Sequence, residues 1–143
     1  MKTPRGACGQ GTVLLACLWL TVLAPGCARV PTPGKPPGVA VPITDVAMVV
    51  GTWHGTLYKV PEMEAQALVR LSVHENATYT FVDISGSSPL LGAGLLTLQD
   101  GRLSEEAERR VTMALYERDA KRLLVVEGVG KTGVQFYAEL TPL

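Results

Sequence analysis

The 143-residue chain carries 13 lysine and arginine residues and 13 aspartate and glutamate residues, so its formal net charge at pH 7 is zero. A nucleic-acid-binding protein needs a concentrated basic surface, which this composition does not offer. We therefore expect no nucleic-acid partner, and the length is sufficient for one small domain.

Residues 1–26 have the pattern of a secretory signal peptide. Lys2 and Arg5 give a basic start, and residues 12–24 form an apolar run of 13 residues. A membrane-spanning helix needs about 20 apolar residues, so this run is short for a span but suits the apolar centre of a signal peptide. No second apolar run follows to indicate a stop-transfer segment. The sequence therefore predicts export.

Cys27 directly follows the small residues Ala24, Pro25 and Gly26. Here the chain resembles a bacterial lipoprotein precursor, in which the cysteine becomes lipidated and N-terminal after cleavage. The resemblance implies that acyl chains such as palmitate on Cys27 anchor the protein to a membrane of the cell envelope. Ala28, where the family places Asp in proteins retained at the inner membrane, implies the periplasmic face of the outer membrane. Cleavage by an ordinary signal peptidase, which would leave a secreted protein, is the alternative.

The other cysteines support the anchor. Cys8 and Cys17 both lie in the segment that cleavage would remove, so the mature chain would keep Cys27 alone. No internal disulfide could then form, and an odd cysteine in an oxidising compartment needs a reason. Lipidation of Cys27 supplies one.

Residues 27–45 are rich in proline and are predicted to be a linker. The segment favours extended, semi-rigid conformations and cannot make a core; its prolines are Pro31, Pro33, Pro36, Pro37 and Pro42. We interpret it as a tether between the lipid and a folded domain at 46–143.

The domain is predicted to be all-β because apolar and polar residues alternate along it. In residues 67–74, for example, Ala67, Val69, Leu71 and Val73 share one face. Asp100-Gly101 is a strong hairpin signal. The expected strands are 49–59, 66–74, 78–83, 93–99, 102–104, 110–117, 122–128 and 134–141. They make a small antiparallel up-and-down meander of seven or eight strands, and closing it into a barrel would hide its edges.

Two segments depart from simple alternation. Residues 104–110 combine Ser104, early acids and late bases, which predicts either one helical turn that acts as a lid or a charged surface connection. Residues 123–126 are apolar on both faces, so we expect packing within the domain, or a partner protein, to cover the outer one.

Gly51-Thr52-Trp53 opens the first strand, and here the domain resembles the lipocalin and fatty-acid-binding barrels, in which a G-x-W motif places Trp at the closed end. The resemblance implies a barrel with Trp53 pointing inward, as a core aromatic or as a ligand contact. The candidate ligand or core residues are Trp53, Leu57, Phe81, Met113 and Phe136. The full inward set adds Val69, Leu71, Val73, Tyr79, Leu96, Leu98, Val111, Leu115, Ala138 and Leu140. A barrel of this size is either filled by these side chains or holds one small apolar ligand.

No residue pattern indicates catalysis or a metal. His54 and His74 are expected on the outer face as diagonal neighbours, but zinc needs three or four ligands, so we expect no metal site and no cofactor. There is no nucleophile elbow, phosphate loop or Cys-His pair, and we predict that the protein is not an enzyme. The function expected is a lipid-anchored binding or interaction module with an envelope protein as its partner. A lipocalin-like carrier of a small apolar ligand is the alternative.

Overall fold

The computed structural model describes residues 37–86, 90–105, 110–130 and 132–143. The predicted signal peptide, Cys27 and most of the proline-rich linker lie outside these residues, as do Glu106 to Arg109 of the charged segment.

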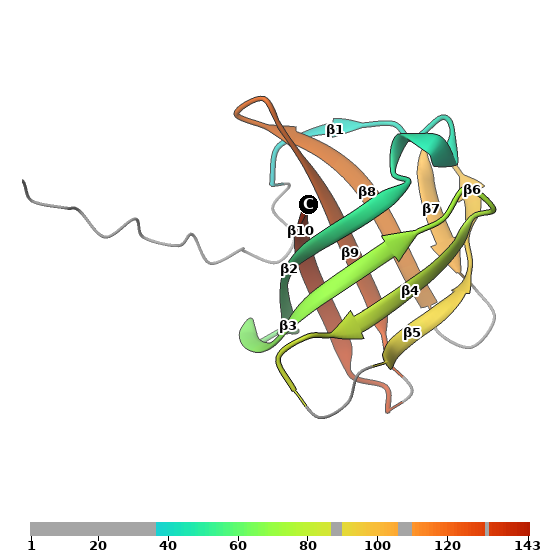
Figure 1. Cartoon of the computed structure of the whole chain (residues 1–143). Coiled ribbons are helices and arrows are strands. Elements are labelled where there is room, and N and C mark those ends of the chain that lie inside the picture. The colour runs from blue at the N-terminus through green and yellow to red at the C-terminus, as the bar shows by residue number, and fades with distance from the viewer. Residues whose placement is uncertain (1–36, 87–89, 106–109, 131) are drawn as a thin grey trace, which may run out of the picture.

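The described residues form an antiparallel, all-β structure, as predicted from the alternation (Figure 1). Apart from one short 3-10 helix, η1, every regular element in the described ranges is a strand. The elements are β1 (Val39–Val41), η1 (Val46–Met48), β2 (Gly51–Lys59), β3 (Glu64–Val73), β4 (Thr78–Asp83), β5 (Leu90–Leu95), β6 (Thr97–Gln99), β7 (Arg102–Glu105), β8 (Arg110–Arg118), β9 (Lys121–Val129) and β10 (Gln135–Pro142).

The strands follow one another round a nearly closed barrel (Figure 1). Their order in the sheet is β5-β4-β3-β2-β10-β9-β8-β7-β6. The pairing of β2 with β10, from Trp53 opposite Pro142 to Lys59 opposite Phe136, joins the first half of the meander to the second. The path ends at β5 and β6, which are consecutive in the chain, so the discontinuity in the barrel wall lies between them.

The ten-stranded sheet has more strands than the seven or eight expected. One reason is that the predicted strand 93–99 is interrupted at Leu96, which separates β5 from β6. The other is β1, which pairs with Leu115 to Glu117 at the part of the β8 edge that β7 leaves open.

The folded body takes in part of the segment that was interpreted as linker. Besides the pairing of β1 with β8, the side chain of Ile43 is buried in the core and its backbone N–H donates to the Gly101 carbonyl at 2.9 Å. Residues from Val39 onward therefore pack as part of the barrel.

The predicted inward positions are buried or partly buried, with one exception. Leu98 pairs with Leu103 across the β6–β7 hairpin as expected, but 39% of Leu98 is exposed whereas Leu103 is fully buried. Leu98 shares the face of the buried Leu103 but stays partly exposed, because β6 is the last strand of the sheet path among the described residues.

Trp53 lies in the core near η1. Its indole Nε1 donates to the Val49 carbonyl at 2.8 Å, and Val46 and Met48 of η1 pack against the same buried cluster. Arg122 donates from its guanidinium to the Met48 carbonyl and so ties η1 to β9.

Candidate functional site

An apolar pocket lies inside the barrel, and we call it the interior pocket. It has a volume of about 190 Å³. Inward-facing side chains of β2, β4, β5, β8 and β10 form its walls, together with two glycines. The lining residues are Leu57, Tyr79, Phe81, Leu91, Gly92, Val111, Gly130 and Phe136.

Two aromatic rings define one wall of the interior pocket. The ring centroids of Phe81 and Phe136 are 6.3 Å apart and the rings are tilted by 35°, within the range of favourable aromatic pairs. Phe136 pairs with Gly128 on β9, and a Cβ at Gly128 would lie 2.6 Å from Phe136 Cζ and 2.7 Å from the Arg110 carbonyl oxygen. Gly128 therefore provides the space in which the Phe136 ring sits.

The structure brings three of the five candidate ligand or core residues to this pocket. Leu57, Phe81 and Phe136 line it, whereas Trp53 and Met113 are buried in the core and are not among its lining residues. Trp53 is four residues from Leu57 along β2, and Met113 is two residues from Val111 along β8. Trp53 and Met113 therefore lie further along the barrel axis than the pocket. The alternation of apolar and polar residues predicts which side chains point inward, but not where along the axis a pocket lies.

The size of the interior pocket limits what it can hold. Pockets for drug-sized ligands begin at about 300 Å³, so this one is smaller. An apolar cavity of about 150 Å³ is nevertheless known to hold benzene. The interior pocket is therefore suited to one aromatic ring or a short aliphatic chain.

Glu105 was not predicted as a site residue, and it is the one buried charged side chain among the described residues, 9% exposed. Its Oε2 accepts a hydrogen bond from the Tyr79 hydroxyl. Ser104 and Glu105 were expected to begin a helical turn or a charged surface connection. They belong instead to β7, where Glu105 faces inward because it has the same parity as the buried Leu103. That parity was the available sequence signal.

The Tyr79–Glu105 pair lies between the interior pocket and a second hollow of about 460 Å³, which Ser104, Glu105, Arg110, Val111 and Thr112 line. Val111 lines both spaces and pairs with Glu105 across β7 and β8. On β5, a Cβ at Gly94 would overlap Glu105 Oε1, so the carboxylate occupies the room that this glycine leaves.

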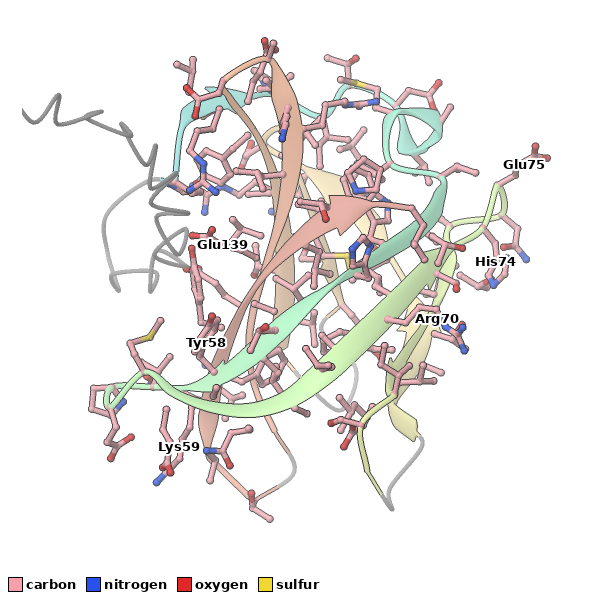
Figure 2. All side chains as sticks on the ribbon, turned by 60° about the vertical axis from the view of Figure 1, so that its left-hand side comes forward. Tyr58, Lys59, Arg70, His74, Glu75 and Glu139 are labelled. Carbon is pink, nitrogen blue, oxygen red and sulfur yellow. The ribbon has the colours of Figure 1, made fainter. Side chains whose placement is uncertain are left out.

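The two histidines do not form a pair. The pairing of β2 with β3 places His54 opposite Arg70, so His74 lies four residues along β3 from that partner and beyond the diagonal position that was expected. Figure 2 shows His74 and Glu75 projecting from the end of β3, away from the barrel. In the described ranges, no group of three or more His, Cys, Asp and Glu residues could hold a metal ion.

A third hollow, which we call the outer groove, lies on the outside of β2, β3, β9 and β10. It has a volume of about 400 Å³ and is lined by His54, Gly55, Thr56, Tyr58, Leu68, Ile84, Arg118, Leu123, Glu139 and Thr141. Leu68 and Ile84 are 54% and 52% exposed, and the Ile84 N–H donates to the Leu68 carbonyl, so the two lie side by side.

Polar side chains occupy the far side of the outer groove. The Tyr137 hydroxyl donates to Glu139 Oε1 at 2.9 Å, and Glu139 Oε2 is 3.5 Å from Arg118 Nη1. Figure 2 places Glu139 and Tyr58 on the outside of the barrel. Burial raises the pKa of Tyr137 well above its ordinary value, and the hydrogen bond to Glu139 raises it further. Leu123 and Val125, on the outward face of the doubly apolar stretch of β9, are buried.

Comparison with known proteins gives no family. Neither a protein-family model, nor a curated protein, nor a solved structure matches the chain. No helix in the described part of the chain has both the length and the apolar composition needed to cross a membrane.

Proposed function

We propose that this protein is a non-enzymatic binding module of the bacterial cell envelope, tethered through a lipid on Cys27, and that its barrel takes a small apolar group into the interior pocket. The observation that carries the binding role is the interior pocket itself, about 190 Å³ in volume and walled by Leu57, Phe81 and Phe136. The ligand is one aromatic ring, or an aliphatic chain of similar size, on a small molecule.

The pocket suits binding for two reasons. Its side chains stand on paired strands, which hold them in place before a ligand arrives. Its walls are apolar, so removing the ligand's apolar surface from water contributes roughly 25 cal/mol per Å².

Toluene is a suitable probe because it matches the pocket in size and has no polar group. We expect toluene to shift the NMR signals of Leu57, Phe81 and Phe136 in a saturable way. Leu57→Phe fills the pocket and should abolish these shifts. Leu68→Phe is the matched control, because it makes the same change on the outer face of β3, and it should bind toluene as the wild type does.

Absence of saturable shifts in the wild type would contradict the binding role, as would unchanged binding by Leu57→Phe. The fold of each variant is checked by its amide spectrum. Gly128→Ala, which forces the Phe136 ring to move, is a second variant that should weaken toluene binding.

The envelope part of the proposal rests on Cys27 and the residues before it. Mass spectrometry of the mature N-terminus should show an acylated Cys27, and membrane fractionation should place the protein in the outer membrane, as Ala28 implies. Cys27→Ser should release the protein from the membrane. An unmodified N-terminus at another residue would instead support secretion.

An interaction with an envelope protein is a second candidate function, favoured by the exposed Leu68 and Ile84 beside the outer groove. Cross-linking from a cysteine introduced at Ile84, in the native envelope, should trap one defined partner. A cysteine introduced at Thr97, which is exposed on β6, is the control. Cross-linking to the same products from both positions would contradict a specific interface.

A further inference from the structure

The inside of the barrel contains one feature that a purely apolar ligand does not explain. Glu105 is 9% exposed, and in the described residues its carboxylate accepts one hydrogen bond, from Tyr79. The two ion pairs found in the described residues, Lys59–Glu62 and Arg118–Glu139, do not include it.

One neutral donor is little compensation for a buried carboxylate. An ionised carboxylate has two oxygens and about four acceptor positions, and burying a charge is costly unless it is paired or well hydrogen-bonded. Tyr79 contacts Oε2, whereas Oε1 lies beside Gly94, which has no side chain. The carboxylate thus has acceptor capacity that a further donor would use.

The position of this carboxylate relates it to the interior pocket. Tyr79 lines the pocket and holds Glu105 through its hydroxyl, and Val111 lines the pocket and is the strand partner of Glu105. A molecule with its apolar part against Phe81 and Phe136 would therefore extend its polar end toward Glu105. A negative polar end would meet a like charge there, and a positive one an opposite charge in a medium of low dielectric.

We propose that the ligand of the interior pocket is a small hydrophobic amine, with its ring or chain in the pocket and its ammonium group paired with Glu105. This inference rests on the proposed function, because it assumes that the pocket binds a ligand. It assigns Glu105 as the residue that selects for charge and Tyr79 as the residue that positions its carboxylate. Anionic amphiphiles such as short fatty acids are excluded by the same carboxylate.

Toluene, benzylamine and phenylacetate test this selection, because they share one ring and differ in charge. Titrations at pH 7 by NMR should show benzylamine binding at least about tenfold more tightly than toluene, equivalent to about 1.4 kcal/mol, and phenylacetate more weakly than toluene. Glu105→Gln keeps the size of the side chain and removes its charge. It should reduce the affinity for benzylamine to that for toluene and leave toluene binding unchanged.

Glu127→Gln is the matched control, since it removes an exposed acid from β9 and should preserve the preference for benzylamine. Gly94→Ala is a second variant, which keeps the charge but displaces the carboxylate. It should lower benzylamine affinity more than toluene affinity.

The outcomes separate the two proposals. If toluene binds but benzylamine binds no more tightly, or if Glu105→Gln changes both affinities equally, the amine proposal is overturned and the apolar binding role stands. If toluene fails to bind the wild type, the proposed function fails, and this inference fails with it.

Discussion

The hydroxyl of Tyr79 on β4 donates a hydrogen bond to the carboxylate of Glu105 on β7, across the part of the barrel where the sheet is discontinuous. Among the described strands, β4 pairs on that side only with β5, and β7 only with β6, so no backbone ladder of these strands joins the two halves there. The hydrogen bond links the first half of the meander to the second from inside the barrel.

Tyr79→Phe tests the contribution of this hydrogen bond to stability. The variant leaves the buried Glu105 carboxylate without the Tyr79 hydroxyl, so we expect the free energy of unfolding to fall by about 1–3 kcal/mol. Urea denaturation measures the change. Tyr58→Phe is the control, because it removes a hydroxyl from the outer face of β2, and it should change the free energy of unfolding by less than about 0.5 kcal/mol.

A similar loss in both variants would mean that the Tyr79 hydroxyl contributes no more than any tyrosine hydroxyl. The Tyr79 hydroxyl would then not be the group that compensates the burial of the Glu105 carboxylate.

Gly128→Ala tests whether the absence of a side chain at Gly128 is what positions Phe136. The added Cβ would lie under 3 Å from both the Phe136 ring and the Arg110 carbonyl oxygen. Overpacking of this kind costs about 1–3 kcal/mol, which thermal or urea unfolding would detect. At Gly130 an added Cβ finds its nearest atom, the Val134 carbonyl oxygen, at 3.6 Å, so Gly130→Ala should be nearly neutral. Equal effects at the two glycines would contradict the steric explanation.

Leu98 and Leu103 offer a comparison between two leucines that face each other across one hairpin. Leu103 is fully buried, so Leu103→Ala should lower the free energy of unfolding by about 2–5 kcal/mol. Leu98 is 39% exposed, and Leu98→Ala should cost less than about 1.5 kcal/mol, since it removes less buried surface. A larger loss of unfolding free energy for Leu98→Ala would contradict the partial exposure of Leu98 on β6.

Alternation predicted the fold class and most of the core because each strand buries one face, and parity alone decides which face that is. It could not locate the interior pocket along the barrel axis, which is why Leu57 and Phe136 line the pocket and Trp53 does not. Glu105 was missed because four charged residues follow within five positions, a pattern typical of surface. Its burial depends on Tyr79, which is 26 residues away in the sequence.

The pairing register of the strands was a second feature that the sequence did not predict. The expected neighbourhood of His54 and His74 assumed that the first two strands of the meander pair about a centre near Met63. His54 instead lies opposite Arg70, so the hairpin is centred one residue earlier and His74 is displaced along β3. β1 was not expected because three residues among prolines carry too little pattern. It forms because β8 has an unpaired stretch of edge that those residues can complete.

Stability should fall at alkaline pH because of Tyr137. Burial and the hydrogen bond to Glu139 raise the pKa of Tyr137 in the folded protein, whereas in the unfolded chain its pKa is about 10. Below pH 10 both states keep the proton and the contribution of Tyr137 to stability is intact. As the pH rises beyond 10 the unfolded state loses its proton first, so the free energy of unfolding declines. Urea midpoints measured from pH 8 to pH 11 should show this decline.

Tyr137→Phe should make that decline shallower, because the residue no longer titrates in either state. Tyr58→Phe, in which Tyr137 is kept, should retain the slope of the wild type. Tyr137→Phe also removes the hydroxyl that donates to Glu139. At pH 8 its free energy of unfolding should therefore be lower than that of the wild type by about 1 kcal/mol, with a correspondingly lower urea midpoint. If the free energy of unfolding of Tyr137→Phe falls as steeply above pH 10 as that of the wild type, another group causes the alkaline loss of stability and Tyr137 titrates normally.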